Sequence, residues 1–137
     1  LSSCGYQPLY TSQNQKNFAF EKVTLIGDKI LNRRVISALN IKEKRDNNLI
    51  DEIILDTNKI TRETSKDEKG QVASYRTIIS LNLTIKNQDD ILKTKIFTED
   101  FSYNTMSNKF DLTEYQREIE NNLINKIIDN LIIYMNL

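Results

Sequence analysis

The clearest pattern in this chain is an alternation of apolar and polar side chains over residues 73–86. One face of this segment carries Ala73, Tyr75, Thr77, Ile79, Leu81, Leu83 and Ile85. The opposite face carries Ser74, Arg76, Ser80, Asn82, Thr84 and Lys86. A period of two predicts a long strand that buries one face. The polar residues 87–90 then predict a turn into an antiparallel strand over 91–103.

An amphipathic helix is predicted nearer the N-terminus. Apolar residues recur at steps of three and four over 30–39, and Asp28 precedes them as a suitable N-cap. Lys42, Lys44 and Arg45 follow, where the negative end of the helix dipole favours positive charge.

A second, longer helix is predicted at the C-terminal end, where an apolar stripe runs over 112–134. Asp111 and Glu114 resemble a capping box, and Ser107 offers a cap for an earlier start. This helix should pack on the apolar face of the long strand. The expected core is Ile79, Leu81, Leu83, Leu123, Ile127 and Leu131.

The segments 18–27 and 49–63 are rich in β-branched and other apolar residues and complete the set of strands. The order β-α-β-β-β-α predicts an α+β fold, with a four-stranded, largely antiparallel or mixed sheet and two helices packed on one face. We expect a single α+β domain over 18–137. Residues 1–17 should form a lipoprotein cleavage site and an extended tether.

Composition removes several classes of function. Lys+Arg and Asp+Glu are both 19, so the net charge is zero and a nucleic-acid partner is not expected. The absence of His and the single Cys remove the commonest metal ligands and general bases, so we predict no metal, no cofactor and no enzymatic activity. The adjacent acids Asp89-Asp90 and Glu99-Asp100 would point to opposite faces of a strand, which does not favour a catalytic pair.

The first residues carry the most specific functional pattern. Leu1, Ser2 and Ser3 precede Cys4, which matches the cleavage site of a bacterial lipoprotein with Cys4 as the lipidated mature N-terminus. An ordinary thiol is the alternative, but the small, turn-forming neighbours of Cys4 do not resemble a core segment. We expect a basic and apolar signal segment upstream of Leu1.

The segment Cys4-Gly5-Tyr6-Gln7-Pro8-Leu9-Tyr10 resembles the start of α-proteobacterial members of the LPS-assembly lipoprotein LptE family. A weaker second match is Ser102-Tyr103-Asn104, followed by Phe110 and the long helix. The resemblance spans most of the chain, although only the first block is specific. It implies a lipid-anchored protein on the periplasmic side of the outer membrane. Such a protein helps the β-barrel LptD to assemble, plugs its lumen and assists lipopolysaccharide delivery to the cell surface.

Contacts with lipopolysaccharide are harder to place. Its phosphates favour Arg and Lys, and the strands over 73–86 and 91–103 would bring Arg76, Lys86, Lys93 and Lys95 together on their outward face. Ordinary solvated charge is the competing interpretation. Two other function classes stay open, namely an accessory lipoprotein of a different envelope complex and a carboxylate-based periplasmic enzyme.

Overall fold

The computed structural model describes residues 18–45 and 51–136 of the chain. The elements in chain order are β1 (Phe18–Phe20), β2 (Lys22–Gly27), α1 (Lys29–Leu39), β3 (Ile41–Glu43), β4 (Asp51–Lys66), β5 (Val72–Asn87), β6 (Asp90–Asn104) and α2 (Lys109–Met135). The expected cleavage site and tether over 1–17 lie outside the described residues.

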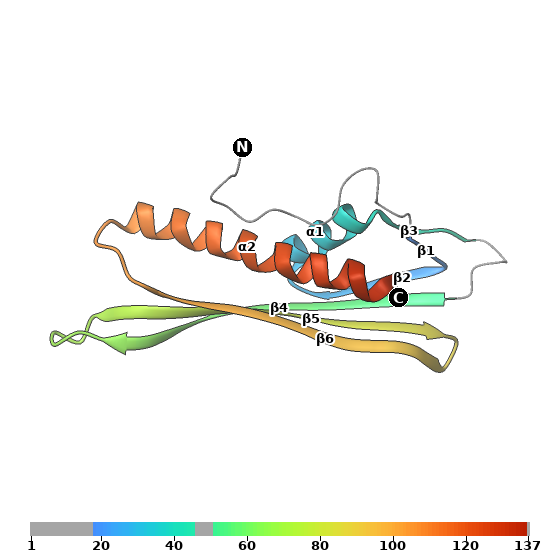
Figure 1. Cartoon of the computed structure of the whole chain (residues 1–137), viewed down its shortest axis with the longest axis horizontal. Coiled ribbons are helices and arrows are strands. Elements are labelled where there is room, and N and C mark those ends of the chain that lie inside the picture. Colours follow the sequence, from blue (N-terminus) through green and yellow to red (C-terminus); the bar gives the residue numbers. More distant parts are fainter. Residues whose placement is uncertain (1–17, 46–50, 137) are drawn as a thin grey trace.

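The main layer is a four-stranded sheet in the order β2-β4-β5-β6. β2 runs parallel to β4, and the β4–β5 and β5–β6 pairs are antiparallel, so the sheet is mixed. Both helices lie on the same face, α1 against β2 and β4 and α2 against β5 and β6 (Figure 1). This confirms the predicted α+β class with its β-α-β-β-β-α order.

The predicted first strand over 18–27 is two strands in the structure. β1 pairs in parallel with β3 in a separate two-stranded sheet, whereas β2 joins the main sheet. The change of partner occurs at Glu21, whose N–H donates to the Asp51 carbonyl at 2.9 Å. β3 was not predicted, because three residues are too short to show a period.

The end of α1 also differs from the prediction. Asp28 is the N-cap, as expected, and its carboxylate accepts from the Leu31 N–H at 2.9 Å. The helix stops at Leu39 because Asn40 takes a left-handed conformation at φ 54°. The chain enters β3 directly, so the expected role of Lys42 and the following basic residues in the last helical turn was wrong.

The core lies between the sheet and the two helices. All six residues expected to form it are buried, with Ile79, Leu81 and Leu83 of β5 facing Leu123, Ile127 and Leu131 of α2. The polar face of β5 points away from the helices. None of the described elements packs on that face, and we refer to it as the uncovered face.

Helix α2 begins one turn earlier than the apolar stripe indicates. Asn108 is its N-cap, with the side-chain oxygen accepting from the N–H groups of Phe110 and Asp111 at 2.9 and 3.1 Å. The predicted caps at Asp111 and Ser107 were therefore wrong. Asn, Asp and Ser are nearly equivalent as N-caps, so sequence preference could not separate them.

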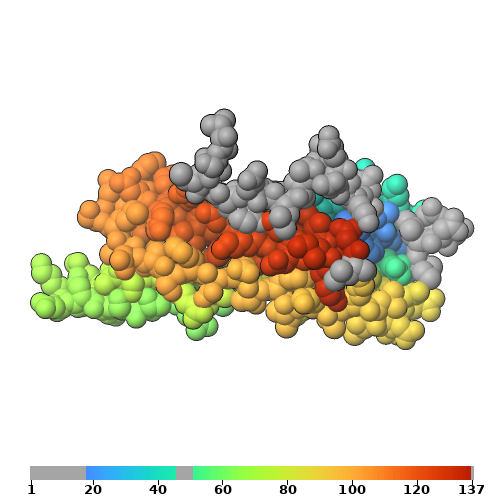
Figure 2. Space-filling model, in the orientation of Figure 1, coloured from blue at the N-terminus to red at the C-terminus, as the bar shows by residue number. Residues whose placement is uncertain are grey.

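The hairpin of β4 and β5 extends beyond the helical layer. Residues 58–71 are all exposed, and the tip projects past the first turn of α2 (Figure 2). β2 pairs with β4 only over Glu52 to Thr57, so from Asn58 onward no described strand pairs with that edge of β4. The chain therefore has a packed body and a polar projection.

Candidate ligand-binding surfaces

The four basic residues predicted to form one outward patch lie on two different faces of the sheet. Lys93 and Lys95 are directly opposite the buried residues Ile85 and Leu83, so both lysines are on the helix-covered side. Arg76 and Lys86 alternate with those buried residues and lie on the uncovered face. The predicted single patch is therefore not formed.

A one-residue irregularity explains this difference. Lys86 is opposite Ile91, but Ile85 is opposite Lys93, so Leu92 is an extra residue in β6. In an unbroken ladder the two lysines would have faced outward. An extra residue transfers every later side chain to the other face, and the sequence carries no marker for it.

Lys93 and Lys95 gather around one aromatic ring near the end of α2. Both ammonium nitrogens lie 5.3 Å from the centre of the Tyr134 ring, and Lys95 also lies 5.8 Å from the centre of Phe97. The two rings meet edge to face at 5.8 Å. Neither lysine has a carboxylate within ion-pair distance in the described part of the chain. Cation–π contact stabilises this end of the helix and leaves both charges available to an anion.

On the uncovered face, Arg76 is paired with Asp100, and its Nε donates to the carboxylate at 2.6 Å. Arg62 of β4 is directly opposite Arg76. Like charges facing each other across two strands are unfavourable, and Asp100 neutralises only one of them. Arg62 was missed by the sequence analysis, because only the β4–β5 register places it there.

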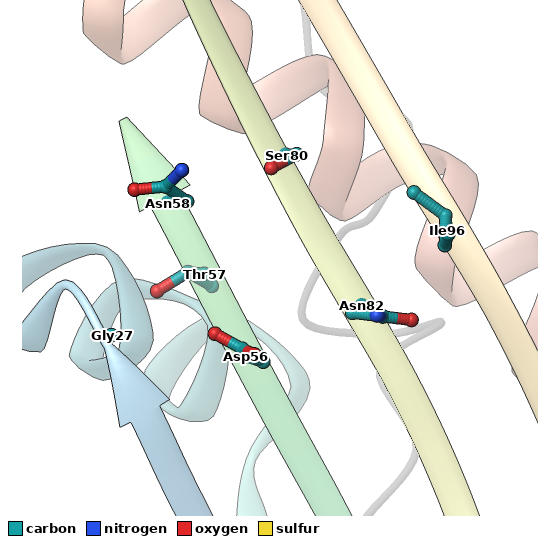
Figure 3. A pocket seen from close by; sticks show the side chains of 7 residues that line it. All are labelled: Gly27, Asp56, Thr57, Asn58, Ser80, Asn82 and Ile96. Atoms are coloured by element: carbon teal, nitrogen blue, oxygen red, sulfur yellow. The ribbon is translucent and has the colours of Figure 1, made fainter. Parts of the chain in front are cut away.

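A shallow hollow opens on the same face, where β2 ends. Its volume is about 350 Å³, and Figure 3 shows the residues that line it: Gly27, Asp56, Thr57, Asn58, Ser80, Asn82 and Ile96. Gly27 fits so tightly against β4 that an added Cβ would lie 1.9 Å from the Thr57 carbonyl oxygen. The chain then leaves the sheet for α1, and the hollow lies at the corner that it vacates (Figure 3).

Residues 18–45 and 51–136 contain neither a cluster of metal ligands nor a membrane-spanning helix. In those ranges no group of three or more acids or other metal-ligating side chains is arranged to hold an ion. No helix there is both long and apolar enough to cross a bilayer. Cys4, the predicted lipidation site, lies outside the described residues.

The architecture defines the class of protein as a small α+β domain with helices on one face of a mixed sheet. It is similar to the rare lipoprotein B from Shewanella oneidensis, with a TM-score of 0.62 and 14% identity, covering 84% of this chain and 93% of that one. For a lipoprotein B from Nitrosomonas europaea the TM-score is 0.57 and the sequence identity 10%, over 89% of this chain and 86% of that one. For a minor lipoprotein from Acinetobacter baumannii the TM-score is 0.54 and the sequence identity 11%, over 83% of this chain and 89% of that one.

At such identities the likeness establishes a shared fold. No protein family profile and no curated protein sequence matches the chain. None of the three names describes an enzyme.

Proposed function

We propose that this chain is an outer-membrane lipoprotein, anchored through Cys4 on the periplasmic side, that works without catalysis as a partner of the lipopolysaccharide-transport barrel LptD. The observation that carries the proposal is the fold shared with proteins named as lipoproteins, which covers 93% of one of them. The pattern Leu1-Ser2-Ser3-Cys4 independently supports a lipid anchor. Several acyl chains on one residue hold a protein stably at a membrane.

The role of barrel insert is supported by the character of the domain surface. The projecting tip over 58–71 is exposed and polar, and the uncovered face carries mainly Thr, Ser, Asn and charged residues. The lumen of an outer-membrane barrel is also polar. A domain with a buried core on one side of its sheet and a polar face on the other suits such a lumen.

Lipopolysaccharide contact is proposed on both faces of the sheet rather than in one patch. Arg76, which is paired with Asp100, and Lys86 lie on the uncovered face but near opposite ends of β5, and Lys93 and Lys95 lie beside Tyr134. Phosphate groups of the ligand are recognised by such cations. Replacing the two basic residues of each face with Ser tests the two faces separately, and Lys66→Ser on the exposed tip is the control. Binding of the purified chain to lipopolysaccharide should fall for at least one pair, and unchanged binding in both would assign all four to plain surface charge.

The barrel partnership is tested by purifying the full chain, tagged at its C-terminus, from native membranes. An outer-membrane barrel should co-purify in stoichiometric amount and be identified by mass spectrometry. Recovery of a different envelope complex would indicate an accessory subunit of that complex, and recovery of no barrel would reject the proposal.

The anchor is tested on the same material. Intact-mass measurement should show Cys4 acylated, and Cys4→Ala should release a normally folded domain from the membrane fraction, since the change removes the proposed lipid attachment and residues near a chain end seldom determine the stability of a domain. An unmodified Cys4 thiol in protein from its native envelope would rule out the anchor.

A further inference from the structure

The hollow at the end of β2 contains polar groups that the fold does not use. Within the described residues, the side chains of Asp56, Asn58, Ser80 and Asn82 make no hydrogen bond or ion pair with the rest of the protein. In the fold, buried polar side chains such as Thr57 and Asn32 are instead bonded to each other at 3.0 Å. These four side chains are therefore available to bond solvent or a ligand.

The chemistry of these four groups matches a polyhydroxylated ring. A carboxylate only accepts, an amide both donates and accepts, and a hydroxyl does either. Vicinal hydroxyls of a sugar need this mixture of acceptors and donors. Asp56 and Asn82 are directly opposite each other across β4 and β5, and Asn58 and Ser80 form the next pair on the same face. Four groups on two adjacent rows can thus contact one ring.

Apolar side chains stand at both ends of the first row. Ile26 of β2 is opposite Asp56 and Ile96 of β6 is opposite Asn82, and their exposed fractions are 49% and 64%. Sugar rings have C–H groups between their hydroxyls, and these pack on aliphatic side chains. Ile96, which lines the hollow, therefore gains burial when a ring occupies it.

The charge and the size of the hollow limit the class of ligand further. No Lys or Arg lines the hollow, and its single carboxylate repels anions. The arginines of this face, Arg62 and Arg76, lie two same-face rows farther along the strands. A volume of about 350 Å³ suits one monosaccharide unit, at the low end of the roughly 300–1,000 Å³ of small-molecule sites.

We propose that this hollow is a binding site for one neutral sugar ring, with Asp56, Asn58, Ser80 and Asn82 bonding its hydroxyls and Ile96 contacting its C–H face. The site goes beyond the proposed function, because sugar binding here requires neither a lipid anchor nor a barrel. Its failure would therefore leave the barrel experiment unaffected, and the reverse also holds.

The test titrates the ¹⁵N-labelled full chain separately with glucose, galactose and mannose, and follows backbone amide shifts. At least one sugar should cause saturable shifts centred on the hollow. Asp56→Ala and Asn82→Ala should each weaken binding about tenfold, as for the loss of one good hydrogen bond. Ser80→Leu should fill the hollow and abolish binding. Ser102→Ala, on the same face of β6 but outside the hollow, is the matched control and should bind normally.

Unchanged spectra with all three sugars would overturn the proposal, as would shifts that persist in Ser80→Leu. If no sugar binds and Ser80→Leu instead prevents co-purification of a membrane partner, the hollow is a protein contact and the sugar site is wrong. Amide dispersion in each variant shows that the sheet is intact.

Discussion

Gly27 is the residue on which the corner of the sheet depends. Its φ of +91° and its approach to the Thr57 carbonyl leave no room for a Cβ at 1.9 Å. Gly70 in the β4–β5 turn has a similar φ of +81° but nothing within 4 Å of an added Cβ. Gly70→Ala should cost only the roughly 1–2 kcal/mol of a left-handed residue. Gly27→Ala should cost clearly more, because β4 must also move.

Urea denaturation of both variants measures this difference. Equal losses of unfolding free energy would show that β2 shifts freely and that the tight contact does not define the corner.

Asn108 supports a second prediction at the residue scale. Its side chain accepts from two orphan N–H groups of α2, so Asn108→Ala should lower the unfolding free energy by about 1 kcal/mol. Ser107→Ala is the matched control and should change it by less than about 0.5 kcal/mol. A larger loss of stability for Ser107→Ala than for Asn108→Ala in thermal melts would show that Ser107 is the N-cap of α2.

Single residues also explain what the sequence could not predict about the candidate ligand surfaces. The types and approximate positions of Arg76, Lys86, Lys93 and Lys95 were available from the alternating pattern. Their faces were not, because Leu92 is an extra residue that no local preference marks. The hollow was not predictable either, since it depends on where β2 stops relative to β4.

At the scale of elements, α2 is held to the sheet by a polar chain as well as by the core. The Tyr103 hydroxyl lies 3.0 Å from the Thr77 hydroxyl and accepts from the Gln116 amide at 3.0 Å. Its ring stacks on Tyr75 and meets Tyr115 edge to face. The Tyr of the Ser102-Tyr103-Asn104 match is therefore a docking residue for α2.

Tyr103→Phe should keep the ring contacts and lose both hydrogen bonds, for a cost of about 1–2 kcal/mol. Tyr134 is the control, because its hydroxyl makes no hydrogen bond within the described residues, and Tyr134→Phe should be nearly neutral. Calorimetric melts of Tyr103→Phe and Tyr134→Phe measure this difference. Equal shifts in Tm would mean that the polar chain does not hold the helix.

Elements with a long period were predictable, and short ones were not. The alternation over 73–86 and the stripe over 112–134 correspond to β5 and α2, because many residues repeat the same spacing. β1 and β3 have three residues each and are defined by pairing with each other, and this pairing depends on the tertiary structure. The division of the first strand at Glu21 has the same origin.

For the whole molecule, the arrangement is one-sided. The helices and the core occupy one face of the main sheet, while no described element covers the other face or the β4–β5 tip (Figure 1). The open surface is mainly polar, with a few exposed isoleucines, and it is hollowed at one corner. A lipid on Cys4 would hold this surface close to the outer membrane, where the proposed barrel lies.

The proposed role in lipopolysaccharide delivery is tested by controlled depletion of the protein in its native cells, with lipopolysaccharide labelled on intact cells. Surface lipopolysaccharide should fall as the protein is depleted, while lipopolysaccharide accumulates inside the cells, and re-expression of the natural chain should restore delivery. Normal lipopolysaccharide at the surface of fully depleted cells would contradict the proposed role.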